Sequence, residues 1–93
     1  NTRVVDIIGA LDGYGVSVDV HDPWVHPDEA MHEYGIAPVE SPIQGDYDAV
    51  VVAVGHRQFV DLGSEGIRAF GKPVSLLYDV KYVLPRHAVD GRL

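Results

Sequence analysis

The stretch AVVVAV, residues 49–54, decides the fold of this chain. A continuous run of this kind, rich in β-branched residues, suits a strand buried on both faces, as the strands of parallel sheets are. Gly55, His56 and Arg57 follow directly and end the run. We therefore predict a central strand over residues 49–54.

Two further strands are predicted, one on each side of this run in the sequence. Val16, Val18 and Val20 alternate with polar residues, and this period of two indicates a strand over residues 16–20. Downstream, residues 74–78 read VSLLY and follow a glycine and a proline that favour a turn. A third strand is expected there.

Helical patterns separate these strands. Apolar residues recur three and four positions apart over residues 4–11, and a proline at position 27 followed by two acids is typical of a first helical turn. Apolar residues over 59–70 mark one or two further turns. Strands alternating with helices predict an α/β fold: a three-layer, Rossmann-like parallel sheet with helices on both faces.

Length and composition limit the classes of protein. A chain of 93 residues has room for one domain, and 14 acidic residues against 7 basic ones oppose binding to nucleic acid or anionic membranes. There is no cysteine, which excludes a cysteine nucleophile in this chain and weakly favours the cytoplasm. No apolar run reaches the roughly 18 residues of a membrane helix. We expect a single soluble cytoplasmic domain.

Polar residues follow each predicted strand. Ligands of open parallel sheets bind beyond the carboxyl ends of the strands, where this chain has Asp22, His56, Asp79 and Lys81. Side chains of these types also cap helices and form turns, so both interpretations stay open for each residue taken alone. Their occurrence after three separate strands favours a shared ligand site.

Other kinds of site are not indicated. Nothing in the sequence joins a nucleophile to a base, so no catalytic residue is predicted. His21, His26 and His32 are spaced so that no two share a helical face, and we predict no metal site. The glycines at positions 9, 13 and 15 do not form the G-x-G-x-x-G fingerprint of dinucleotide binding.

Three stretches carry a family resemblance: NTRVVDIIGALDGYGVSVDVHDPWV, DYDAVVVAVGHRQF and LLYDVKYVLPRHAVDGRL. They resemble the C-terminal UDP-binding domain of the UDP-glucose/GDP-mannose 6-dehydrogenase family over nearly the whole chain. The pairing of AVGHRQF with YDVKYVLP is most similar to bacterial enzymes that oxidise UDP-N-acetylhexosamines for surface polysaccharides. Such enzymes also have an NAD-binding Rossmann domain and a central domain with a catalytic cysteine. The resemblance therefore makes residues 1–93 a single, truncated C-terminal domain of a larger enzyme.

The resemblance also implies an activity and its partners. The family oxidises the sugar C6 alcohol of a UDP-hexose or UDP-N-acetylhexosamine to a carboxylate with two NAD molecules, through a thiohemiacetal on the cysteine. NAD would bind to another domain, and this chain alone would be inactive. The expected partners are a UDP-sugar, the other domains of the enzyme and further copies in a homo-oligomer.

Lys81 matches the basic residue that contacts the nucleotide side of the substrate, where related enzymes carry Arg. A Lys gives a point charge instead of a bidentate fork, so the detailed contact does not carry over. Asp79, Asp22 and His56 also match motif positions of the family, and for each of them a structural role in a turn or a helix cap stays open. We expect these four residues to bind the UDP-sugar substrate.

One departure concerns the start of the chain. Family members place a strand before the helix that opens this sequence, and in their sheets that strand lies between residues 16–20 and residues 49–54. We therefore expect a sheet without its first strand, and a piece that is strained, marginal or oligomeric. Two alternatives stay open: a free-standing flavodoxin-like module that binds a small ligand or a protein, and a purely structural fragment.

Overall fold

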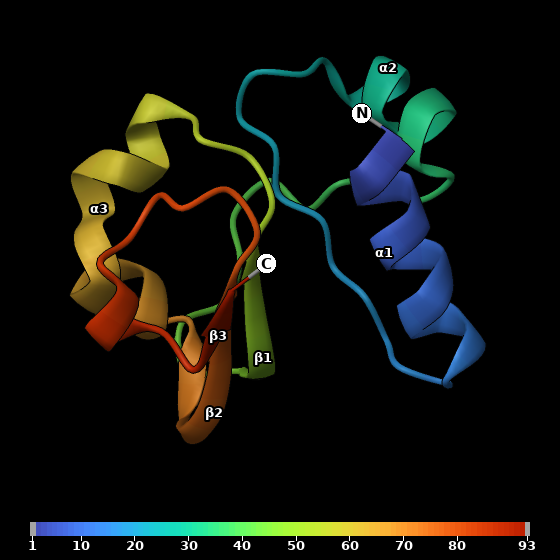
Figure 1. The fold of residues 1–93 in the computed structure, drawn as a ribbon. Coiled ribbons are helices and arrows are strands. Elements are labelled where there is room, and N and C mark those ends of the chain that lie inside the picture. Colours follow the sequence, from blue (N-terminus) through green and yellow to red (C-terminus); the bar gives the residue numbers. More distant parts are fainter. Residues whose placement is uncertain (1, 93) are drawn as a thin grey trace. The chain divides into compact units, whose positions relative to one another are not determined.

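The computed structural model describes residues 2–92, which form two compact units (Figure 1). The first unit ends at Pro42 and contains two helices. The second begins at Ile43 and contains a three-stranded parallel sheet with one α-helix and one 3-10 helix. Parallel strands that alternate with helices confirm the α/β, Rossmann-like class predicted from the sequence.

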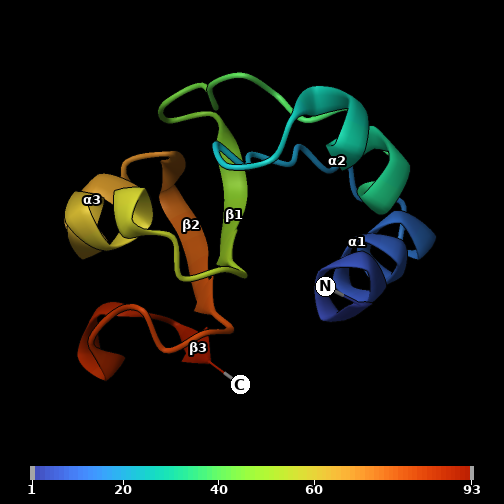
Figure 2. The same ribbon diagram turned by 90° about the horizontal axis from the view of Figure 1, so that it is seen from above.

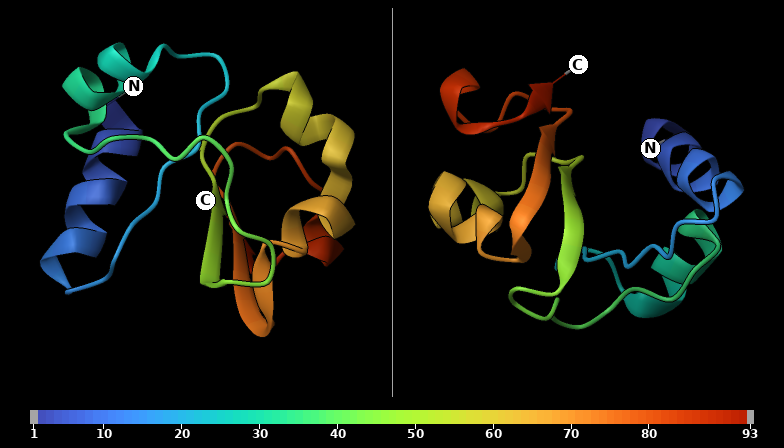
Figure 3. Two further views of the ribbon diagram at one scale, coloured as in Figure 1. Left: turned by 180° about the vertical axis from the view of Figure 1, so that it is seen from behind. Right: turned by 90° about the horizontal axis from the view of Figure 1, so that it is seen from below.

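The first unit is built from α1 (Thr2–Gly13) and α2 (Pro27–Tyr34), which lie side by side (Figure 3). Both helices are where the sequence predicts them. Val4 and Ile8 are the buried residues of α1, and Ala30 and Tyr34 are those of α2. Their spacing of four residues puts each pair on one face of its helix, and this is the apolar stripe expected of an amphipathic helix.

Local signals explain the bounds of α2. His26 precedes the helix, and its Nδ1 accepts a hydrogen bond of 3.3 Å from the backbone N–H of Asp28. Asp28 and Glu29 lie in the first turn, where the helix dipole favours negative charge. The N–H of Gly35 donates to the carbonyl of Met31 and closes the last turn. These caps stabilise a helix of only 8 residues.

The prediction of a strand over residues 16–20 is wrong, because these residues form no strand in the structure. The apolar face of this pattern is kept only in part, because Val18 and Val20 are half-buried whereas Val16 is 45% exposed. One backbone bond of 2.7 Å, from the N–H of Val39 to the carbonyl of Val20, ties the segment to a neighbour. A strand needs a ladder along its whole length, and an alternating pattern without a partner strand does not form one.

The sheet of the second unit has the order β1-β2-β3, with all strands parallel. It consists of β1 (Tyr47–Val52), β2 (Gly71–Asp79) and the short β3 (Gly91–Arg92). The helix α3 (Arg57–Arg68) lies against one face of the sheet, as Figure 2 shows. The 3-10 helix η1 (Arg86–Ala88) connects β2 to β3. The strand predicted over residues 74–78 is confirmed as part of β2.

The run of residues 49–54 does not form a central strand with two buried faces. β1 ends at Val52 and lies at one edge of the described sheet, paired with β2 alone. Val50 and Val52 pack towards the core, whereas Val51 between them is 37% exposed. A run of β-branched residues indicates a strand. It does not determine the number of neighbouring strands, which depends on the other segments of the sheet.

The core of the second unit lies between the sheet and α3. Leu77 is 1% exposed at its centre. The other buried members are Val52, Ile67 and Leu84, with Val50, Phe59, Val83 and Val89 packed around them. The core therefore joins all the longer elements of this unit to the segment that follows β2.

The helix α3 is interrupted at Gly63, which has φ 67° and ψ 178°. These angles are accessible to glycine and strained for other residues, so the helix consists of two short pieces. The second piece carries Ile67 into the core and Arg68 to its end. Among residues 2–92, no helix is both long and apolar enough to span a bilayer.

Tyr34→Phe tests the packing of the first unit. The Tyr34 hydroxyl donates to Asp22 Oδ2 at 2.9 Å, and burial together with this bond raises the pKa of Tyr34 to about 12. Removing the hydroxyl should cost about 1 kcal/mol of stability at pH 7, measured by urea unfolding. This contribution is present below pH ~10 and is lost as the pH rises towards the folded-state pKa. The variant should therefore match the wild type near pH 12.

The matched control is Tyr14→Phe. Tyr14 is 87% exposed, so the loss of its hydroxyl should leave the free energy of unfolding unchanged. Equal effects at the two positions would contradict a stabilising role for the bond between Tyr34 and Asp22.

Candidate functional site

The carboxyl ends of the three strands meet at one end of the sheet. Val52 of β1 pairs in register with Asp79 of β2, which pairs on its other side with Arg92 of β3. The loops that follow β1 and β2 also approach each other, since a Cβ placed on Gly55 would lie 3.8 Å from a methyl group of Val83. The polar residues after β1 and β2 therefore gather at this end of the sheet.

Asp79 organises the turn after β2. Its side chain is fully buried, and its Oδ1 accepts from the backbone N–H of Lys81 at 3.1 Å. Its Oδ2 accepts from the backbone N–H of Leu84 at 2.8 Å. Both oxygens are used inside the turn, so Asp79 fixes the position of Lys81 instead of presenting its own charge. The side chain of Lys81 is exposed.

Tyr82 follows Lys81 in an unusual backbone conformation. Its φ of 56° lies in the left-handed region, which costs a residue with a Cβ roughly 1–2 kcal/mol. The Tyr82 side chain is 58% exposed, and the guanidinium carbon of Arg92 lies 4.0 Å from the centre of its ring. This distance is that of a cation–π contact. The bonds to Asp79 and the contact with Arg92 hold this turn in place.

The cations of the second unit fall into two groups. Three of them form ion pairs: Arg57 with Asp61 at 3.7 Å, Arg68 with Asp90 at 3.2 Å, and Lys72 with Asp48 at 2.9 Å. The other three, Lys81, Arg86 and Arg92, have no acidic partner among the described residues. All three lie after β2, so this segment carries uncompensated positive charge.

The net negative charge of the chain comes from the first unit. Residues 1–42 contain one basic and eight acidic residues, whereas residues 43–93 contain six of each. The second unit is therefore formally neutral, and its three unpaired cations are not outweighed by acids near them in sequence. Taken by itself, the second unit has no net negative charge that would oppose an anion site at this end of the sheet.

His56 and Asp22 lie in different units of the chain and have different contacts. His56 immediately precedes α3, and its ring stacks on that of Phe59 with centroids 5.7 Å apart. Asp22 belongs to the first unit, where its carboxylate accepts from the N–H of Trp24 at 3.1 Å and from the Tyr34 hydroxyl. Of the four predicted site residues, the structure brings Asp79 and Lys81 into one turn and puts His56 at the same end of the sheet.

The histidines of the first unit also have local contacts. His21 Nδ1 lies 3.3 Å from the carbonyl oxygen of Val39, and His26 caps α2. Within residues 2–92, no group of three or more histidines and acids has the geometry to hold a metal ion.

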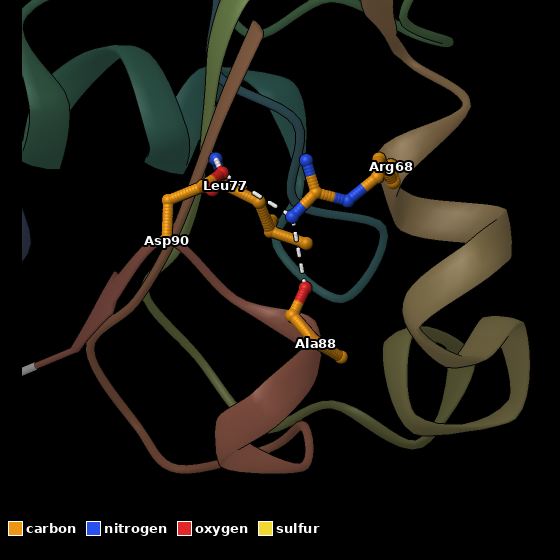
Figure 4. Close-up of polar contacts among 4 residues, drawn as sticks. All are labelled: Arg68, Leu77, Ala88 and Asp90. Atoms are coloured by element: carbon orange, nitrogen blue, oxygen red, sulfur yellow. Dashed lines mark hydrogen bonds and ion pairs between the residues drawn. The ribbon is translucent and has the colours of Figure 1, made fainter.

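Sequence reasoning missed the contacts that hold β3 in place (Figure 4). Asp90 Oδ2 accepts from the backbone N–H of Leu77 at 2.8 Å and from the guanidinium of Arg68 at 3.2 Å. The N–H of Asp90 donates to the carbonyl of Leu77 at 2.8 Å. The same Arg68 nitrogen donates to the carbonyl of Ala88 at 2.9 Å. The Asp90 carboxylate thus extends the ladder between β2 and β3 and connects it to α3.

Asp90 and its neighbour Gly91 each have a further property that bears on β3. The bond from the Leu77 N–H has the largest effect and lowers the pKa of Asp90; burial opposes it, and the Arg68 guanidinium adds to the lowering. Gly91 allows β3 to approach closely, because a Cβ there would lie 2.7 Å from the ring of Tyr78. The sequence signal was the short run of Asp90, Gly91 and Arg92, which periodicity does not detect.

Comparisons with known proteins identify the family of this chain. The model of the UDP-glucose/GDP-mannose dehydrogenase family, UDP binding domain, matches residues 1–86. The chain therefore belongs to this family and corresponds to its UDP-binding domain. No solved structure matches the chain.

Three curated relatives are similar to the chain. UDP-N-acetyl-D-glucosamine 6-dehydrogenase from Salmonella typhi is 52% identical over all 93 residues, and the protein of the same name from Pseudomonas aeruginosa is 50% identical. Protein CapL from Staphylococcus aureus is 27% identical over 84 residues, or 90% of this chain. The chain spans 22% of the length of the first two relatives and 20% of the third.

Asp79→Ala tests the turn that carries Lys81. The change leaves two backbone N–H groups without their acceptor, at a cost of about 1–3 kcal/mol each where they stay buried. Urea unfolding should show this loss. Asp48→Ala is the control, because Asp48 is an exposed acid whose pairing with Lys72 contributes little. Similar losses at the two positions would contradict the organising role of Asp79.

Asp90→Asn tests the attachment of β3 through its pH dependence. The pKa of Asp90 is lowered in the folded state, so its contribution is present above pH ~4 and is lost as the pH falls through the lowered pKa. The variant should melt below the wild type at pH 6, and the difference in melting temperature should shrink as the pH falls through the lowered pKa. A difference that stays constant as the pH falls would show that the charge of Asp90 contributes nothing.

Proposed function

We propose that this chain is the UDP-binding domain of an NAD-dependent UDP-sugar 6-dehydrogenase, and that residues 1–93 act in it as one domain. Such an enzyme oxidises a UDP-hexose or a UDP-N-acetylhexosamine to the uronate. The proposal is supported by two relatives, 52% and 50% identical, that are named UDP-N-acetyl-D-glucosamine 6-dehydrogenase. We further propose a cytoplasmic enzyme of surface-polysaccharide synthesis that works as a homo-oligomer.

The observation that carries the proposal is the exposed, unpaired Lys81 at the carboxyl end of β2. Open parallel sheets bind ligands at this end. The diphosphate of a UDP-sugar is an anion, and the Lys ammonium offers it three hydrogen-bond donors and a compact charge. Because Asp79 holds the backbone of Lys81, the turn is already formed before a ligand arrives. Preorganisation of this kind lowers the entropic cost of binding.

His56 and Asp22 have supporting roles in this proposal. His56 stands at the start of α3, where its ring and that of Phe59 limit the site on the side of β1. Asp22 stabilises the first unit through Tyr34, and a contact between Asp22 and the UDP-sugar remains part of the proposal.

We assign NAD and the chemical step to other domains of the enzyme. The turn between β1 and α3 contains one glycine, Gly55, whereas the phosphate cradle of a dinucleotide fold needs the spacing G-x-G-x-x-G. The chain also contains no cysteine to form the thiohemiacetal. In this proposal the residues of the chain bind and orient the nucleotide half of the substrate, and they do not touch the reacting C6 atom.

Lys81→Ala in the complete enzyme tests the proposal. The contact lies away from the reacting carbon, so KM for the UDP-sugar should rise about tenfold while kcat changes less than about twofold. Steady-state kinetics measures both. Lys72→Ala is the control, because Lys72 pairs with Asp48 and should leave both constants unchanged. An unchanged KM in Lys81→Ala would remove Lys81 from the site.

The wild type gives an independent measurement. A ligand that binds only the folded state raises the melting temperature, so millimolar UDP should raise that of the complete enzyme. Without any shift, a free-standing interaction module or a structural role would replace the proposed function.

A further inference from the structure

Arg92 is a second cation at the strand ends, and the proposed role of Lys81 does not account for it. It lies in β3 in register with Asp79, the residue whose carboxylate holds the turn of Lys81. Arg92 and Lys81 therefore belong to the same end of the sheet. The guanidinium carbon of Arg92 is 4.0 Å from the centre of the Tyr82 ring.

Stacking on Tyr82 leaves the hydrogen-bonding capacity of Arg92 unused. A guanidinium is planar, and its five N–H donors point outwards in that plane. A ring below the plane stabilises the cation but accepts none of these in-plane hydrogen bonds. Arg92 has no acidic partner among the described residues, so no carboxylate there competes for its donors. The in-plane fork fits two oxygens of one phosphate.

Several contacts fix Arg92 in this position. Asp90 extends the β2–β3 ladder by bonding both backbone groups of Leu77, and Arg68 connects the segment to α3. Gly91 lets the backbone of β3 pass beside the ring of Tyr78. A cation that is held before the ligand arrives loses less conformational freedom on binding than a free surface side chain.

Arg86 provides the contrast within the same segment. It also lacks an acidic partner among the residues that the structure describes, but it is exposed on η1, away from the paired backbone of β3. No aromatic ring of residues 2–92 lies beneath its guanidinium. Arg86 therefore matches Arg92 in charge and in chain segment, and it lacks the features that hold Arg92 in place.

We propose that Arg92, stacked on Tyr82, is a phosphate-binding residue of the UDP site. Lys81 and Arg92 then form a two-cation site in which Lys81 supplies a point charge and Arg92 a bidentate fork. This inference rests on the proposed UDP-binding function and adds a residue to that site. It also offers a reason for the left-handed backbone conformation of Tyr82, since in this conformation the Tyr82 ring lies under the guanidinium of Arg92.

Calorimetric titration of the complete protein with UDP and with uridine tests the inference. Arg92→Gln should weaken UDP binding about tenfold, the change expected for one charge-assisted contact, and should leave uridine binding unchanged. Arg86→Gln should leave both affinities within about twofold of the wild type. Melting temperatures without ligand show whether each variant is folded.

Variants at Tyr82 separate the charge of Arg92 from its positioning. Tyr82→Leu keeps every charge but removes the ring, so it should weaken UDP binding by less than Arg92→Gln does. Tyr82→Phe keeps the ring and should bind UDP as the wild type does. If Tyr82→Phe is as weak as Tyr82→Leu, the hydroxyl and not the stacked ring is responsible, and the proposed positioning by stacking is overturned.

The remaining outcomes distinguish the inference from the function on which it rests. Equal UDP affinities of Arg92→Gln and Arg86→Gln, with Lys81→Ala weakened, would overturn the role of Arg92 and leave the UDP site intact. An equal loss of UDP and uridine binding in Arg92→Gln would place its effect on the base or on the fold, which also overturns it. A wild type that does not bind UDP overturns the proposed function and this inference together.

Discussion

The buried carboxylate of Asp79 is the constraint on which the structure at the carboxyl end of the sheet depends. A carboxylate that is fully removed from solvent is costly unless hydrogen bonds compensate it. Here two backbone N–H groups of the following turn, those of Lys81 and Leu84, provide these bonds. The same bonds bring Leu84 into the core and leave the Lys81 side chain in solvent. The same two hydrogen bonds therefore stabilise the turn and leave the charge of Lys81 exposed.

Asp90 plays a complementary part at the other edge of β2. Its carboxylate acts where a strand would offer a backbone carbonyl, so two residues of β3 are sufficient to continue the sheet. Arg68 then links this edge to the second piece of α3, beyond the break at Gly63. Two acids thus fix the two segments that carry the unpaired cations, and neither acid needs to touch a ligand.

The sequence predicted what depends on local pattern and missed what depends on partners. Helical spacing and caps located α1 and α2, and the apolar residues 74–78 located β2. The alternation of residues 16–20 indicated a strand, but pairing is a property of two segments, and the pattern of one cannot supply the other. Lys81 was found by its position after a predicted strand, and the family resemblance then singled it out. The bonds of Asp90 and the stacking of Arg92 arise from tertiary contacts that no spacing encodes.

The separation of charge between the two units affects how fast an anion reaches the site. Beyond the Debye length of about 8 Å in physiological salt, little of the field of the acidic residues 1–42 remains, and in dilute buffer it extends several times further. At low ionic strength the net charge of −7 repels an anion at long range, whereas the cations Lys81 and Arg92 attract it only at short range. Added salt weakens both effects. For the proposed UDP site, the association rate would therefore be less sensitive to ionic strength than the local cluster of cations alone would suggest.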